Sequence, residues 1–461
     1  MMTRINERLM PARNATRRRL AKPFGLPFGL TIGLALAAAA VAGFGLSADH
    51  AQAQQKSEIK IGIVSFLSGP AAGPFGIPAR DGSQLVIDGI NGGTIPSPYD
   101  SKGILGAKIV PVFIDEAGGS AKQVAEFRNL VQRQNVDVVI GYISSGDCLA
   151  IAPVAEELKA LTIFGDCGTP RIFEQGSYKY VFRTRSHAAM DNISAALYLK
   201  EMMPNIGRYG GINQNYAWGQ DSWRDFSAAM SVLHPSAEVT TKQFPKIFAG
   251  QYSSEISALL LSRSDVVHSS LWGADLESFI FQATARGLDR RTQLVFTSAE
   301  PNMFRLGDKM PDGVLIGARG PYGVYAHDTP LNRWFRAEYI RRHDTPPVYA
   351  SYVLGQAFLA LKISVEKAAA ANEGNWPTTE QIIAAMEYLE FEAFGSRVKL
   401  ALGKGHQAIT ETAVGRYKYD EAAGGATIVD IKYYPAECVN PPEGAESVEW
   451  IRGGMKGARC D

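Results

Sequence analysis

Residues 59–70 read IKIGIVSFLSGP, an apolar and largely β-branched run that ends in a loop with glycine and proline. A continuous apolar run of this length, bounded by turn residues, is typical of a buried strand. Runs of the same kind recur at 108–115, 136–142 and 161–164, and amphipathic stretches separate them. Strands that alternate with helices form parallel sheets covered on both faces, so this pattern predicts an α/β fold.

Residues 1–53 have the features of an export signal. A basic front with three arginines at 17–19 precedes an uncharged stretch rich in glycine, alanine and leucine at 23–48. The leader ends in AQA at 51–53, which suits a signal peptidase, so we expect a periplasmic protein that begins at Gln54. The arginine run resembles a twin-arginine signal. An uncleaved membrane anchor stays open as the alternative, because the apolar stretch is long enough to cross a bilayer.

The remaining chain also contains a second block of alternating elements, with strand patterns at 209–218, 266–270 and 293–297. Roughly four hundred residues exceed what one hydrophobic core usually supports. We therefore predict two Rossmann-like lobes with parallel central sheets and a cleft between them. Lobe 1 is expected at 54–183 plus 313–393, and lobe 2 at 184–312 plus 394–461.

Charge excludes several classes of partner. The whole chain has 47 Lys+Arg and 46 Asp+Glu, and loss of the leader removes seven basic and two acidic residues, which leaves a net charge of −4. A mildly acidic chain without a basic cluster has no electrostatic footprint for nucleic acid or anionic membranes. The sequence after the leader lacks G-x-S-x-G, P-loop, G-x-G-x-x-G, C-x-x-C and H-E-x-x-H motifs. We therefore expect no enzyme, no metal and no cofactor.

The chain has four cysteines, Cys148, Cys167, Cys438 and Cys460, which fall into two pairs each separated by about twenty residues. An exported protein meets oxidising conditions. Two local disulfides, 148–167 and 438–460, are the simplest interpretation, although four cysteines allow three connectivities.

Several short motifs point to a family. They are SGP at 68–70 followed by FG at 75–76, IDGIN at 87–91, Asp115 at a strand end, GYISS at 141–145, NYAWG at 215–219 and TSAE at 297–300. In this order behind an export leader, they resemble the type I periplasmic solute-binding proteins of ABC transporters, in the leucine/isoleucine/valine-binding protein family. The resemblance covers nearly all of the mature chain. It implies two lobes joined by a three-crossover hinge that close on a ligand, and a membrane permease as partner; we expect a monomer.

The resemblance also implies ligand-binding residues. In amino-acid binders of this family a serine hydroxyl and backbone amides hold the ligand carboxylate, and Ser145, with Ser144 and Gly146 beside it, matches that serine loop. The alternative is that these serines cap the following helix. Glu300 matches the acidic residue for the ligand ammonium, with a solvated loop residue or a cap as its alternative. Further expected cleft residues are Phe75, Gly168, Tyr216, Trp272 and Asp275.

Asp166 departs from the family pattern, because amino-acid binders usually carry small and hydroxyl residues in this loop. It would place a second negative charge near a ligand carboxylate, and like charges repel. Either Asp166 points away and caps the next helix, or the ligand is not a simple α-amino acid. We expect a branched-chain or other amino acid as ligand. An amide, a urea-like compound or an aromatic carboxylate is the alternative ligand, and a ligand-sensing receptor domain the alternative role.

Overall fold

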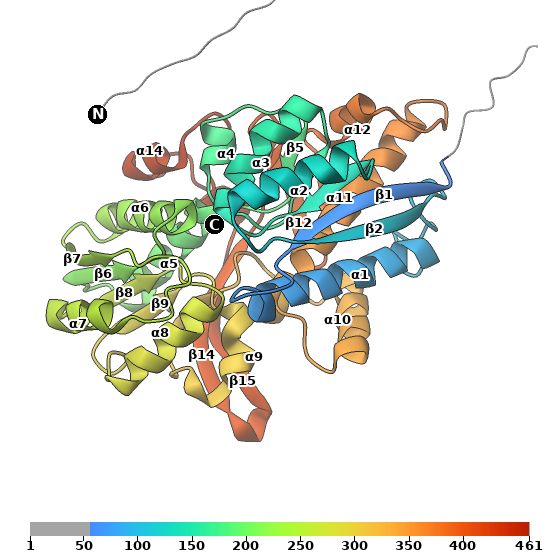
Figure 1. Ribbon diagram of the computed structural model, residues 1–461. Helices are drawn as coiled ribbons and strands as arrows, with labels where there is room; N and C mark the ends of the chain where they lie inside the picture. The colour runs from blue at the N-terminus through green and yellow to red at the C-terminus, as the bar shows by residue number, and fades with distance from the viewer. Residues whose placement is uncertain (1–55, 461) are drawn as a thin grey trace, which may run out of the picture. The chain divides into compact units, whose positions relative to one another are not determined.

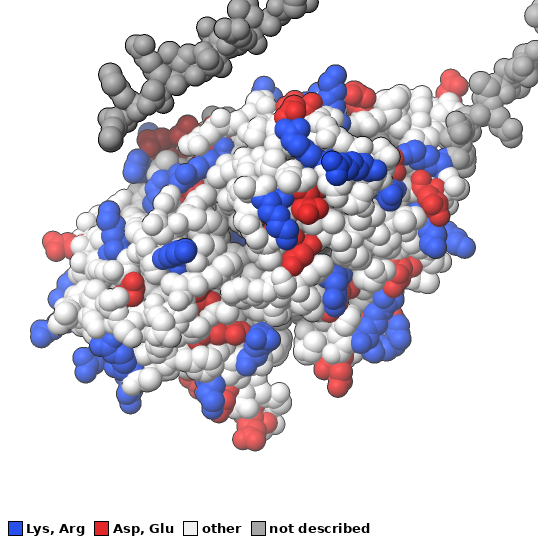
Figure 2. Space-filling view, in the orientation of Figure 1, with Lys and Arg blue, Asp and Glu red and all other residues white. Residues whose placement is uncertain are grey.

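The computed structural model describes residues 56–460, and the leader predicted at 1–53 lies outside the described residues. The described chain forms two α/β lobes, each built on a mostly parallel sheet (Figure 1). This confirms the predicted fold. Between residues 56 and 460, no helix is long and apolar enough to cross a membrane. Basic and acidic side chains are interspersed on the face drawn in Figure 2, in keeping with the balanced charge of the sequence.

The first lobe begins with five strands and four helices in alternation. Their bounds are β1 Glu58–Ser65, α1 Ile77–Gly92, β2 Lys108–Asp115, α2 Ser120–Gln132, β3 Val138–Gly141, α3 Ser145–Leu158, β4 Thr162–Phe164, α4 Arg171–Glu174 and β5 Val181–Arg183. The strands pair in parallel in the order β2-β1-β3-β4-β5, and Val64 lies beside both Ile114 and Gly141. Parallel pairing brings the carboxyl ends of these strands to one edge, where ligands bind such sheets.

The second lobe repeats this plan. Its elements are α5 Ala188–Met202, β6 Arg208–Ile212, α6 Ala217–Leu233, β7 Glu238–Gln243, α7 Ser253–Ser262, β8 Val266–Ser269, α8 Ala274–Ala285, β9 Gln293–Phe296, β10 Leu315–Gly317, β14 Thr412–Asp420 and β15 Gly425–Tyr434. The order is β15-β14-β10-β9-β8-β6-β7, in which β14 pairs antiparallel with both β10 and β15, and the other pairs are parallel. The centre of the sheet is parallel, as the sequence predicted, and one edge is antiparallel.

The remaining helices and strands complete both lobes. They are α9 Met303–Leu306, α10 Pro330–His343, α11 Tyr349–Ala370, α12 Thr379–Met386, β11 Glu390–Glu392, β12 Arg397–Leu402, β13 Gln407–Ile409, α13 Ala436–Val439 and α14 Ser447–Arg452. The long helix α11 is mostly buried and packs against α1. Gly82 allows this close approach, since a Cβ there would overlap the carbonyl of Ser351. This packing fixes the start of α11 beside the cleft.

The chain crosses between the sheets three times, after β5, after β10 and after β13. The first crossing follows β5, which ends at Arg183. The expected boundaries at 312/313 and 393/394 differ from the pairing, because β10 pairs with β9 and β14, whereas β12 and β13 extend the first sheet beside β5. The apolar pattern of a short strand does not specify its neighbours, so the sequence did not reveal these two crossings.

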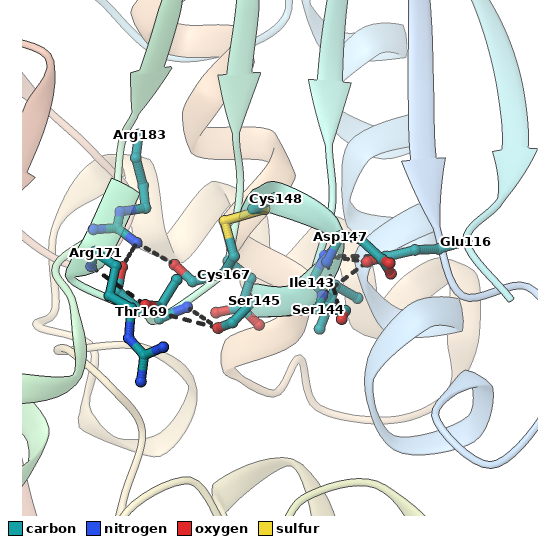
Figure 3. The surroundings of a disulfide bond; sticks show 12 residues. Glu116, Ile143, Ser144, Ser145, Asp147, Cys148, Cys167, Thr169, Arg171 and Arg183 are labelled. Atoms are coloured by element: carbon teal, nitrogen blue, oxygen red, sulfur yellow. Dashed lines mark hydrogen bonds between the residues drawn. A yellow bond between two sulfur atoms is a disulfide. The ribbon is translucent and has the colours of Figure 1, made fainter. Parts of the chain in front are cut away.

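Both predicted disulfides are present. Cys148–Cys167 joins the first turn of α3 to the loop after β4 (Figure 3), with Cα atoms 6.4 Å apart. Cys438–Cys460 joins α13 to the C-terminal end, with Cα atoms 4.6 Å apart. The first disulfide therefore links two of the loops at the carboxyl edge of the first sheet.

Replacing Cys148 and Cys167 together with serine is expected to lower the free energy of unfolding by about 3 kcal/mol. The disulfide closes a short loop, with a sequence separation of 19, and so restricts the unfolded chain. Equilibrium urea unfolding of the oxidised protein measures this. The matched control is the double serine variant of Cys438 and Cys460, which opens a loop of similar length (sequence separations 19 and 22). Only the first variant should also weaken ligand binding; equal effects of the two variants on binding would contradict a local role for Cys148–Cys167.

Candidate functional site

A small cavity lies between the lobes. The first lobe contributes Phe75, Ile143, Ser145, Asp166, Gly168 and Tyr349, the second contributes Tyr216, Trp218, Trp272 and Ser298, and Arg319 follows β10. Six of the expected ligand-binding residues line it, namely Phe75, Ser145, Asp166, Gly168, Tyr216 and Trp272. Their contact with a ligand remains a prediction, but the fold brings them together.

Ser144 and Ser145 begin helix α3, and their hydroxyls have different partners. Ser144 is the N-cap, and its Oγ accepts a hydrogen bond from the amide of Asp147 at 3.4 Å. Ser145 Oγ accepts hydrogen bonds from the amides of Gly168 and Thr169, each at 3.1 Å (Figure 3). Because this oxygen already accepts two hydrogen bonds, its proton is left to donate to a ligand. The capping role and the cavity role are thus divided between the two serines.

Glu116 is a buried carboxyl group that the sequence analysis missed. Its side chain accepts hydrogen bonds from the amides of Ile143 at 2.9 Å and Ser144 at 2.7 Å (Figure 3). These amides belong to the serine loop that the resemblance assigns to the ligand carboxylate. Burial raises the pKa of Glu116 well above its usual range, and the nearby Asp147 raises that pKa further. An internal acidic side chain therefore occupies part of the expected anion-binding position.

Asp166 is buried against the cavity, and its charge is paired. Its Oδ1 lies 2.6 Å from Arg319 Nη1 and 3.2 Å from Arg185 Nη1. Arg319 Nε also donates to Asp191 at 3.0 Å. Burial raises the pKa of Asp166, and the two guanidinium groups oppose that shift. The repulsion expected between Asp166 and a ligand carboxylate is therefore offset by two arginines that the sequence analysis did not identify.

Arg319 presents a positive charge to the cavity. Its guanidinium carbon lies 4.4 Å from the centroid of the Trp218 ring, and Nη1 donates to the carbonyl and carboxylate of Asp166 at 2.8 and 2.6 Å. Its Nη2 is buried and has no hydrogen-bond partner in the described chain. A buried donor without a partner costs about 1–3 kcal/mol, and more when it belongs to a charged group. A ligand carboxylate is a suitable acceptor for such a nitrogen.

Aromatic rings form the rest of the cavity wall. The Phe75 ring centroid lies 5.1 Å from that of Trp272 and 5.6 Å from that of Tyr349, both in edge-to-face arrangements. Trp272 Nε1 donates to the hydroxyl of Tyr216 at 2.8 Å, and Trp218 Nε1 donates to a backbone carbonyl. These hydrogen bonds fix the rings, so the cavity offers preformed apolar surfaces. Trp218 and Tyr349 were not identified from the sequence.

Residues 58–426 match the family model described as periplasmic binding protein. The chain belongs to this family. A curated relative, the Leu/Ile/Val-binding protein BraC3 of Rhizobium johnstonii, is 27% identical over 177 residues, which are 38% of this chain and 44% of that protein. The chain thus spans less than half the length of this relative in the alignment.

Solved structures share the fold of this periplasmic binding protein. A solute-binding protein of an ABC transporter from R. palustris, in complex with benzoate, has a TM-score of 0.71 at 20% identity and covers 84% of this chain and 99% of its own. The leucine-binding protein LivK from Thermotoga maritima has a TM-score of 0.68 at 18% identity, covering 81% and 98%. The chain is therefore a member of the periplasmic binding protein family and has the two-lobed fold of these solute-binding proteins.

Glu300 lies outside the cavity lining of this binding protein. The side chain is fully buried, Oε2 accepts a hydrogen bond from the amide of Tyr349 at 2.7 Å, and Oε1 accepts one from the amide of Val324 at 3.3 Å. It therefore satisfies an amide at the start of α11, which is the capping alternative, and it positions Tyr349 at the cavity. Burial raises the pKa of Glu300 to about 8.

The raised pKa of Glu300 predicts a pH dependence of stability. Folded Glu300 holds a proton up to about pH 8, whereas its ordinary pKa is 4.5, so between these values the folded state binds more protons. Stability should therefore fall as the pH rises through this window, by up to about 1.4 kcal/mol per pH unit. Urea unfolding between pH 5 and 8 should show a smaller decline for Glu300→Gln. Buried Asp225, whose pKa is raised to about 7, also titrates in this pH range, but it is present in both proteins. The difference between their slopes therefore reports on Glu300 alone. Equal slopes would rule out this role.

Asp275 and Gly146 also lie outside the cavity lining. Asp275 is buried, and its Oδ2 accepts hydrogen bonds from Gln214 Nε2 and the amide of Phe248, both at 2.6 Å. Gly146 lies in the first turn of α3, where a Cβ would meet its nearest atoms only at 3.7 Å. Their expected contact with the ligand is therefore not favoured by this geometry. No group of three His, Cys, Asp or Glu side chains suited to a metal ion occurs in the described part of the chain.

The lobes touch through two sets of polar contacts. The amide of Ala274 donates to the carbonyl of Pro70 at 3.0 Å. Thr169 Oγ1 donates to Asp221 at 2.6 Å, and the Arg171 guanidinium pairs with the same carboxylate. Since Pro70, Thr169 and Arg171 belong to lobe 1 and their partners to lobe 2, these contacts hold the lobes in a closed arrangement.

Proposed function

We propose that this solute-binding protein captures a small aromatic carboxylate in the interlobe cavity and delivers it to an ABC permease. The observation that carries the proposal is the partnerless Nη2 of Arg319, which is buried in a cavity walled by aromatic rings. A carboxylate would accept from this nitrogen and from the hydroxyl of Ser145, while an aromatic ring would pack against Phe75 and Trp272.

The charges around the cavity favour an anion over a zwitterion. An α-ammonium needs an acidic partner, but Asp166 is already paired with Arg319 and Arg185. Glu300, the residue expected to hold an ammonium, accepts backbone amides instead. The hydrogen-bond donors of this cavity therefore outnumber the acceptors that are still available to a ligand. Burying a ligand ammonium without a free acidic partner is costly, so an anion is favoured.

The lining of the cavity supports an aromatic ligand. Five of its eleven lining residues are aromatic. The fold neighbour from R. palustris was solved with benzoate, which makes benzoate the first probe to use.

A branched-chain amino acid is the second candidate ligand. Asp166 is an acidic side chain on the cavity wall, and the curated relative is named a Leu/Ile/Val-binding protein. For this candidate, an α-ammonium has to take over part of the contact that Arg319 and Arg185 make with Asp166.

Isothermal titration of residues 54–461 with benzoate, 4-hydroxybenzoate, leucine and valine separates the two candidates. We expect saturable binding of the benzoates and at least 100-fold weaker binding of both amino acids. Benzamide, which keeps the ring but lacks the charge, is the matched control and should bind more weakly than benzoate. Tight binding of leucine or valine with none of benzoate would replace the ligand class.

We also propose that residues 1–53 are removed on export and that the protein acts as a monomer in the periplasm. The basic front and the AQA motif at 51–53 support cleavage. N-terminal sequencing of the exported protein should begin at Gln54. A retained leader would instead support a membrane-anchored binding protein or a ligand-sensing receptor.

A further inference from the structure

A second cavity, of about 190 Å³, lies away from the interlobe cleft, between α4, the turn from β12 to β13, and residues 441–446 before α14. In Figure 1, α14 lies beside α4 at this place. The groups that matter for its chemistry are Phe173, Glu174, His187, Lys404, Glu443 and Glu446. None of these residues lines the interlobe cavity.

The C-terminal segment forms one wall of this cavity and is bonded in place. The amide of Ser447 donates to Glu174 Oε1 at 2.9 Å, and the hydroxyl of Ser447 donates to the same oxygen. The amide of Lys404 donates to Glu443 Oε1 at 2.7 Å. The segment follows residue 426, where the match to the family model ends. The cavity is therefore built partly from chain outside the family match.

His187 supplies an unsatisfied polar group to this cavity. The residue is only 2% exposed, yet it lines the cavity, and its Nδ1 has no hydrogen-bond partner in the described chain. Burial lowers the pKa of His187 well below its usual range, so the imidazole is neutral and offers one donor and one acceptor. Leaving such a buried nitrogen unpaired costs about 1–3 kcal/mol, which a polar ligand group would recover.

The charges and apolar surfaces of the cavity indicate the ligand class. Three carboxyl groups, those of Glu174, Glu443 and Glu446, and one ammonium, that of Lys404, line the cavity. The guanidinium of Arg183 lies 5.7 Å from the centroid of the Phe173 ring and adds a second positive charge nearby. Phe173 and three prolines, at 170, 441 and 442, supply apolar surface. Excess negative charge beside an aromatic ring and prolines suits a cation carried on a short apolar body.

We propose that this cavity is a second ligand site, for a small organic cation such as a primary amine on an aromatic or aliphatic body. The amine would lie near the glutamates, with its body against Phe173 and the prolines, and a polar group or bound water would reach His187 Nδ1. The site is independent of the ligand proposed for the interlobe cavity. It adjoins two of the three crossings, since His187 directly precedes α5 and Gln407 of β13 also lines it.

Benzylamine is the probe for this site, and benzyl alcohol is its uncharged counterpart. Residues 54–461 are titrated with each compound, with and without saturating benzoate, and the ring nitrogens of the histidines are followed by NMR. We expect one saturable benzylamine site that shifts the His187 ring, is at least tenfold tighter than for benzyl alcohol, and is not competed by benzoate. Competition by benzoate would place the amine in the interlobe cavity and overturn the proposal.

Two exposed glutamates of the cavity allow a charge test without disturbing the core. The double substitution Glu443→Gln and Glu446→Gln should weaken benzylamine binding at least tenfold and leave the binding of benzyl alcohol unchanged. Glu449→Gln removes an exposed carboxylate of α14 that does not line the cavity, and it should have no effect. No saturable binding to the unaltered protein, or equal binding to it and to the double variant, would reject the site.

Discussion

Gly168→Ala is expected to weaken ligand binding at least 100-fold while leaving the ligand-free protein folded. A Cβ at this position would overlap the Trp218 ring and come within 2.5 Å of Arg319 Nη2. Trp218 belongs to the second lobe and Gly168 to the first, so the added methyl group opposes closure of the lobes. The φ of Gly168 lies outside the left-handed region, so alanine introduces no backbone strain there.

Calorimetry measures the loss of affinity, and small-angle scattering with and without benzoate measures closure. The matched control is Gly146→Ala, because a Cβ at Gly146 meets its nearest atom at 3.7 Å, an ordinary contact. The control should bind benzoate and contract on binding like the unaltered protein. Normal contraction of the Gly168→Ala protein with benzoate would show that the close approach of Trp218 is not needed for binding.

Arg319→Lys should weaken benzoate binding by about 10- to 100-fold, because a hydrogen bond to a charged group contributes about 1.5–3 kcal/mol. Lysine keeps a positive charge near Asp166, so the buried carboxylate is not left unpaired, but it loses the planar Nη2 donor and the stacking on Trp218. Benzamide binding should change much less, since the uncharged amide does not depend on a cationic donor.

Asp191→Asn is the control for this substitution. Asp191 accepts from Arg319 Nε at 3.0 Å but does not line the cavity, and asparagine keeps an acceptor there. The benzoate affinity of Asp191→Asn should stay within about threefold of that of the unaltered protein, because substitutions away from critical contacts usually change free energies by about 0.5 kcal/mol or less. If Arg319→Lys binds benzoate normally, the carboxylate is held elsewhere, and the amides at the start of α3 become the first alternative.

The two-lobed fold was predictable because its signal is local. β1, β2, β3 and β4 are short apolar runs separated by amphipathic stretches, and this alternation specifies parallel sheets whatever the details of packing. The crossings after β10 and β13 were not predictable, because a strand's partner depends on contacts between segments far apart in the sequence. β13, for example, pairs with β5 more than two hundred residues earlier.

The site was predictable where its residues directly follow strands of the first half of each lobe. Asp166 and Tyr216 lie in such loops, and Ser145 begins the helix that follows β3. Arg319 follows β10, which lies in the second sheet, whereas the predicted boundaries put residues 313–393 in lobe 1, so its arrival at the cavity was not foreseen. Glu300 has the expected position along the chain, but the start of α11 lies beside it. The amide of Tyr349 donates a hydrogen bond to its carboxyl group, which is therefore not directed at the ligand position. Sequence position identifies a loop; it does not specify the direction of a side chain.

The disulfide Cys148–Cys167 connects ligand recognition to the redox state of the compartment. It ties the turn that carries Ser145 to the loop that carries Asp166 and Gly168, and in the reduced chain the hydrogen bonds of Ser145 Oγ are left to hold these loops together. Oxidising conditions occur outside the cytoplasm. Formation of this disulfide thus fixes two loops of the cavity relative to each other before a ligand binds.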